Sequence, residues 1–108
     1  MQNKIYYRVY VDNIKNLSNP LIAQLGIGNW ATLCVLASFA DENNQCYPAM
    51  GTIALLLGVD IRTVKRYIKS LSNIVYEGEK LVTVSKIKLD KKVTKNVYTL
   101  NSKIMSIF

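Results

Sequence analysis

The chain has 108 residues and a net charge of +7, and half of its residues are hydrophobic. This size and composition indicate a single domain spanning residues 1–108 and exclude a disordered tail. No apolar run reaches the length of a membrane span, and the first residues lack the apolar centre of a signal peptide, so we expect a cytoplasmic protein. Two cysteines do not make a disulfide scaffold, and we expect Cys34 to be buried in an apolar helix.

The positive charge lies in the second half of the chain. Residues 1–59 are neutral overall, whereas residues 60–108 hold eleven Lys or Arg against four Asp or Glu. A polyanion is the natural partner of such a segment, because neutralised phosphates release condensed counterions. A membrane surface would require a basic helix with apolar surface to spare, and the apolar positions here are needed for the core. The charge therefore predicts a nucleic-acid partner.

The first elements predicted along the chain are a strand and two helices. Residues 5–11 have strand composition and predict an edge strand or an ordered arm within residues 1–17. A short helix is expected at about 20–25, ending at Gly26. Residues 29–40 are apolar nearly all round and predict a helix packed on several sides. The following residues 41–48 read as a polar loop.

Residues 52–71 have the spacing of a helix-turn-helix. Ala54 is small enough to let two helices approach, and Gly58 suits a left-handed turn. Val64 then points back into the core. Asp60 is placed to cap the second helix, because its carboxylate can accept the free N–H groups of the first turn. The two helices are expected at about 49–57 and up to Asn73.

The outward face of the second helix is cationic. With Val64 at 0° on a helical wheel, Ile68 and Leu71 form the buried stripe. The opposite side carries no carboxylate, whereas ordinary surface helices interleave acids with bases. This pattern predicts a recognition helix in the major groove of duplex DNA. The DNA contacts expected from it are Arg62, Thr63, Lys65, Arg66, Lys69 and Ser70, with Arg62 and Arg66 reading guanine edges.

A basic hairpin is predicted after this helix. Residues 80–89 and 96–100 alternate and are rich in β-branched residues, and a charged connection at 90–95 joins them. We expect its cations to lie along the DNA backbone or to reach the minor groove. These residues are Lys86, Lys88, Lys91, Lys92 and Lys95.

Motifs across two thirds of the chain carry a family resemblance. They are LASFAD at 36–41, YP at 47–48, GVDIRTVKRYIKSL at 58–71 and NVYTL at 96–100. In these the chain resembles winged helix-turn-helix modules of replication-associated and regulatory proteins from phages, plasmids and other bacterial mobile elements. The resemblance implies an α+β fold, in which three to four helices precede a β-hairpin wing. It also implies DNA binding, with Arg62, Thr63 and Arg66 at positions that approach DNA.

The chain departs from that pattern in three places. Ala49 stands where a Ser usually caps the first motif helix, and Ile61 stands where a polar residue usually follows the second cap. The second of these removes one potential hydrogen bond to DNA. Residues 72–82 replace a tight exit from the recognition helix, so the wing is expected to pivot differently.

Two classes of function remain open from the sequence. The first is a non-enzymatic duplex-DNA binder that serves replication, transcription control or partition of a mobile element. The alternative is a single-stranded DNA-binding or protein-interaction winged helix accessory to replication. Stacking on bases would involve Tyr6, Tyr7 and Tyr10, whereas Tyr67 and Tyr98 are expected in the core.

Catalysis and cofactors are not expected. The chain has no His, no metal-ligand cluster and no complete nucleotide-binding glycine motif. No catalytic, cofactor-binding or metal site is therefore predicted. The apolar tail at 101–108 needs a partner, which is the N-terminal strand, a second copy in a homodimer or a further part of a longer chain.

Overall fold

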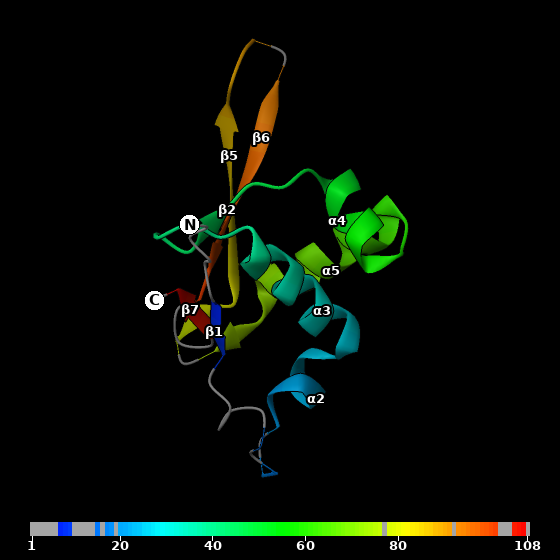
Figure 1. The fold of residues 1–108 in the computed structure, drawn as a ribbon, viewed down its shortest axis with the longest axis vertical. Helices are drawn as coiled ribbons and strands as arrows, with labels where there is room; N and C mark the ends of the chain where they lie inside the picture. Colours follow the sequence, from blue (N-terminus) through cyan, green and yellow to red (C-terminus); the bar gives the residue numbers. More distant parts are fainter. Residues whose placement is uncertain are drawn as a thin grey trace, which may run out of the picture.

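The computed structural model describes residues 7–9, 15, 17–18, 20–76, 78–91, 93–101 and 105–107. They form an α+β fold with four helices and antiparallel strands, as predicted (Figure 1). The helices are α2 (Leu21–Leu25), α3 (Ile27–Ser38), α4 (Met50–Leu57) and α5 (Ile61–Asn73). The strands are β1 (Tyr7–Val9), β2 (Gln45–Cys46), β3 (Val75–Tyr76), β4 (Glu79–Lys80), β5 (Val82–Lys88), β6 (Thr94–Leu100) and β7 (Met105–Ile107).

Helices α2 and α3 meet at a glycine. Gly26 has φ 91° and ends α2, as predicted, while α3 begins at the next residue. Helix α3 buries Leu33 and Leu36 but leaves Cys34 exposed. The prediction of a buried Cys34 was therefore wrong. At 100° per residue Cys34 lies about 160° from Leu36, which is buried, so the two side chains point to opposite sides of α3.

Helices α4 and α5 form the predicted helix-turn-helix. Gly58 ends α4 with φ 71°, and its N–H donates to the carbonyl groups of the preceding turn. Ala54 and Val64 are buried between the helices. Asp60 caps α5, because its Oδ1 accepts the N–H of Thr63 at 2.8 Å. No side chain caps α4, whose N-cap residue is Ala49.

The packing of α3 on α5 depends on a glycine. The ring of Tyr67 lies directly against Gly28, and a Cβ at that position would collide with it. Tyr67 is consequently half-buried at the edge of the core rather than inside it. Tyr98 is fully buried, as predicted.

A short strand interrupts the segment that was predicted to be a polar loop. The Oδ1 of Asp41 accepts the N–H groups of Asn43 and Gln45, and this turn leads into β2. Strand β2 pairs with β6, so the three-stranded sheet has the order β2-β6-β5. Cys46 is buried, and burial together with the charge of Asp41 raises its pKa to about 12.

Strands β5 and β6 form the predicted hairpin, which extends away from the helices (Figure 1). Their register runs from Val82 opposite Leu100 to Lys88 opposite Thr94. Strand β6 therefore begins two residues before the predicted position. The turn closes through the N–H of Leu89, which donates to the carbonyl of Val93.

The exit from α5 contains a second hairpin that the sequence did not predict. Strands β3 and β4 pair on either side of residue 77 and Gly78, which has φ 85°. Asn101 is buried beneath them, and its Nδ2 donates to the carbonyl groups of Tyr76 and Glu79. A two-stranded hairpin thus connects α5 to β5.

The apolar tail pairs with the N-terminal strand. Strand β7 runs antiparallel to β1, with Arg8 opposite Ser106. Of the three partners considered for the tail, this pairing corresponds to the first. Three predicted binding or stacking residues, Tyr6, Tyr10 and Lys92, lie outside the described residues. Among the described residues no helix is long and apolar enough to cross a bilayer.

Candidate nucleic-acid interface

Helix α5 presents a continuous exposed arc. At 100° per residue, six exposed residues span about 140°, from the edge of the core stripe to the side opposite it. Four of them are cations, and no Asp or Glu occurs anywhere in α5. The members of this arc are Ile61, Arg62, Lys65, Arg66, Lys69 and Asn73. We refer to them as the α5 arc.

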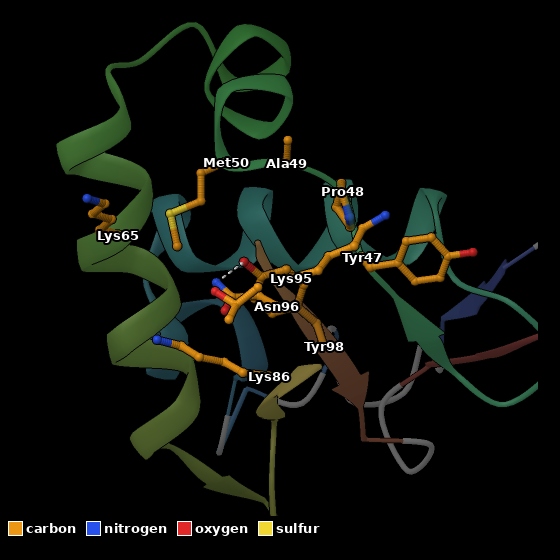
Figure 2. A pocket seen from close by; sticks show the side chains of 10 residues that line it. Tyr47, Pro48, Ala49, Met50, Lys65, Lys86, Lys95, Asn96 and Tyr98 are labelled. Carbon is orange, nitrogen blue, oxygen red and sulfur yellow. Dashed lines mark hydrogen bonds between the residues drawn. The ribbon is translucent and has the colours of Figure 1, made fainter. Parts of the chain in front are cut away.

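A groove lies between α5, the segment before α4 and the β5–β6 hairpin (Figure 2). Its volume is about 530 Å³. Lys65 from α5, Lys86 from β5 and Lys95 from β6 line it, together with the polar groups of Thr94 and Asn96. None of the described residues that line this groove is acidic. We call it the lysine groove.

Two interactions order the side chains around the lysine groove. The Nδ2 of Asn96 donates a hydrogen bond of 3.2 Å to the hydroxyl of Tyr98. Burial raises the pKa of that hydroxyl above its ordinary value, so Tyr98 is neutral at physiological pH. At the mouth, the Nζ of Lys95 lies 4.1 Å from the centre of the Tyr47 ring, which is a cation–π contact.

The register divides the hairpin cations between two faces. Lys86 is opposite Asn96, so both side chains lie on the face that lines the lysine groove, and Lys88 continues that face. Lys95 is opposite Ile87, on the other face, and reaches the groove over Tyr47. Lys91 is exposed in the turn between the strands.

Two residues predicted to touch DNA lie on the flank of α5 away from the arc. The hydroxyl of Ser70 accepts a hydrogen bond of 2.9 Å from Asn29 on α3. Thr63 is half-buried, and its hydroxyl and N–H both bond to the carboxylate of Asp60. These bonds hold the pKa of Asp60 below its ordinary value. The polar atoms of Thr63 and Ser70 are thus already engaged within the domain.

Sequence reasoning missed three members of this surface. Ile61 lies at about 60° on the wheel, at the edge of the arc, and was treated only as the loss of a polar residue. Asn96 is opposite Lys86 in the strand register, and it was missed because the sequence predicted this strand to begin two residues later than it does. Tyr47 is brought beside Lys95 by β2, a strand that the sequence did not predict.

The helix-turn-helix segment has a match among known protein families. Residues 30–72 match the family model of a helix-turn-helix domain. The match begins within α3 and ends within α5, so it covers the two motif helices and the turn at Gly58. The β5–β6 hairpin lies outside it. No curated protein and no solved structure matches the chain.

Proposed function

We propose that this helix-turn-helix protein binds duplex DNA, with α5 in the major groove and the β5–β6 hairpin along the backbone. The observation that carries the proposal is the continuity of the α5 arc with the lysine groove: Lys65 belongs to both. A surface of cations without a carboxylate suits a phosphate backbone. Helix-turn-helix domains present the start of their second helix to base edges, which supports the same orientation.

The side chains on the arc divide into two roles. Arg62 and Arg66 offer the planar fork that binds the O6 and N7 atoms of guanine, so they are the candidates for base recognition. Lys65 and Lys86 line the groove from α5 and from the hairpin, and they would hold one phosphate strand between these elements. Lys69, Lys88 at the end of β5 and Lys91 in the turn would add contacts to the DNA backbone, together with the sequence-predicted Lys92.

The biological setting that we propose is a bacterial mobile element. The resemblance in residues 30–100 supports replication, transcription control or partition of such an element, with the protein located at a plasmid or the nucleoid. No catalytic role is proposed. If the protein acts as a homodimer, its two half-sites would lie about one helical turn apart.

A second candidate function rests on the cation–π contact between Tyr47 and Lys95 at the lysine groove. Tyr47 is 54% exposed, and the Lys95 ammonium group lies over its ring. An exposed ring beside a cation is the arrangement that stacks unpaired bases. Single-strand binding accessory to replication is therefore the alternative outcome.

A salt titration against random duplexes and random single strands tests the proposal, and the bound duplexes are then selected and sequenced. We expect a slope of log K against log salt of about −5 for about six phosphate contacts, together with an enriched sequence. A steep slope without any enriched sequence, or a preference for single strands, would overturn the major-groove assignment.

Charge reversal identifies the surface responsible. The double variant Arg62→Glu with Arg66→Glu is expected to lose duplex binding while it keeps its helical circular dichroism. The matched control is Lys15→Glu with Lys80→Glu, which makes the same charge change at exposed positions off the arc. Equal losses in both variants would mean that net charge, rather than α5, carries the binding.

A further inference from the structure

One residue of the α5 arc is apolar. Ile61 is the first residue of α5, directly after the Asp60 cap, and 47% of its surface is exposed. The stripe that builds the core behaves differently: Val64 and Leu71 are fully buried, and Ile68 is 5% exposed. Ile61 therefore leaves about half of its aliphatic surface open at the edge of the α5 arc, next to Lys65.

The surroundings of Ile61 leave one polar side chain free at the start of the helix. The Asp60 carboxylate is occupied by Thr63, as described above. Arg62 is exposed about 100° further round the helix, and Lys65, one turn later, is the cation nearest to Ile61 on the arc. The first turn of α5 thus exposes one aliphatic surface and one guanidinium at consecutive sequence positions.

The major groove has one apolar group that such a surface fits. Each base pair shows donors and acceptors there, but only thymine adds a methyl group, at C5. The first turn of a recognition helix is the part that reaches base edges. An exposed isoleucine in that turn would otherwise desolvate polar base edges without offering a hydrogen bond, which is unfavourable.

We infer that Ile61 reads a thymine through its C5 methyl group, next to the base pair that Arg62 contacts. The inference rests on the proposed duplex binding and adds a specificity-determining residue to it. Burial of one methyl group is worth about 0.8 kcal/mol, which corresponds to about a fourfold change in affinity. The expected change in affinity is therefore small, confined to one thymine of the duplex, and measurable.

The test replaces thymine by uracil, which differs only in that methyl group. In the duplex enriched by selection, each thymine is replaced in turn by deoxyuridine, and the dissociation constant is measured by fluorescence anisotropy. For the unmodified protein we expect about a fourfold loss at one thymine. In Ile61→Ala that same replacement is expected to change the affinity by less than about 1.5-fold, because the partner of the methyl group has been removed.

A second variant separates this effect from a general loss of apolar surface. Val75→Ala shortens another exposed β-branched residue, 60% exposed and located beyond the opposite end of α5. It is expected to keep the fourfold uracil penalty. Circular dichroism of Ile61→Ala checks that the domain is folded.

The outcomes distinguish the inference from the function on which it rests. If the protein binds the selected duplex but tolerates uracil at every thymine, or if the penalty persists in Ile61→Ala, the methyl contact is overturned and duplex binding stands. If no duplex is bound with any sequence preference, the proposed function fails and this inference fails with it.

Discussion

Asp60 connects the stability of α5 to the position of the residues proposed to read DNA. Its carboxylate accepts bonds from both the hydroxyl and the N–H of Thr63. The two side chains between them, Ile61 and Arg62, are held in the first helical turn by this cap. Loss of the cap would fray the turn that carries the base contacts.

Asp60→Ala is predicted to be less stable at pH 7, by an amount that shrinks in acid. The folded pKa of Asp60 is lowered, mainly by the Thr63 hydroxyl and then by its N–H, so the charged form stabilises the fold. That contribution is present above the ordinary pKa of 3.8 and is lost as the pH falls through the folded value. Urea denaturation of the unmodified protein and of Asp60→Ala, from neutral pH to about pH 2.5, measures this difference in the free energy of unfolding.

A control for this prediction is Glu42→Ala, which removes an exposed carboxylate that caps no helix. Its stability should follow that of the unmodified protein at every pH. A loss in Asp60→Ala that is constant across the pH range would contradict the assignment, because it would show that the charge of the cap plays no part.

Single residues could be predicted from the sequence where a local rule fixes them. The cap at Asp60 and the left-handed glycine at Gly58 depend on a few neighbouring residues, and both were confirmed. Cys34 and Ser70 depend on which neighbour covers their side of a helix. Helix α3 approaches Ser70 through Asn29, whereas Cys34 is exposed, and neither fact is encoded near those positions.

The same distinction holds for whole elements. Helix α5 was predicted to within a residue because its apolar stripe repeats every turn and both ends have chemical signals. Strand β2 has two residues, and only its pairing with β6 makes it a strand. Strands β3 and β4 likewise arise from a turn at Gly78 and from the buried amide of Asn101. Elements made by distant partners leave little periodic signal.

Gly58 in the turn between α4 and α5 can be compared with Gly51, which lies inside α4. Gly58 has φ 71°, a conformation that costs other residues about 1–2 kcal/mol. Gly51 lies in α4 with a negative φ and open space where a Cβ would sit. Gly58→Ala is predicted to lower the free energy of unfolding by about 1–2 kcal/mol, whereas Gly51→Ala should leave it unchanged or raise it by up to about 1 kcal/mol.

Chemical denaturation of the two variants measures the difference. Because neither site offers atoms for the new methyl group to touch, packing does not obscure the backbone effect. Equal effects at both positions would show that the turn relaxes out of its left-handed conformation. The spacing between α4 and α5, and with it the placement of the α5 arc, would then not depend on Gly58.

At the scale of the whole molecule, the fold brings together cations from separate parts of the second half of the chain. The arc on α5 is remote in sequence from the hairpin cations, yet Lys65, Lys86 and Lys95 line one groove. The sequence singled out these cations as a prediction but not that they line one groove, because the strand register and the pivot of the hairpin decide this. Concentrated charge of one sign also has a cost, since it repels itself in the compact state.

Salt is therefore predicted to act with opposite signs on the free and the DNA-bound protein. Raising NaCl from about 20 mM to about 200 mM shortens the Debye length from roughly 20 Å to roughly 7 Å, so repulsion among the clustered lysines weakens and the free protein becomes more stable. A selected duplex at about 100 times its dissociation constant adds about 2.7 kcal/mol to the stability at the lower salt concentration. With a slope of about −5, that gain disappears over the same tenfold rise in salt.

Thermal unfolding at the two salt concentrations, with and without the duplex, measures all four states. The free protein should gain stability from salt, and the complex should lose it. A free protein that salt destabilises would mean that ion pairs already neutralise these cations in the folded state. They would then not be available for phosphate, so this result would count against the α5 arc and the lysine groove as the DNA-binding surface.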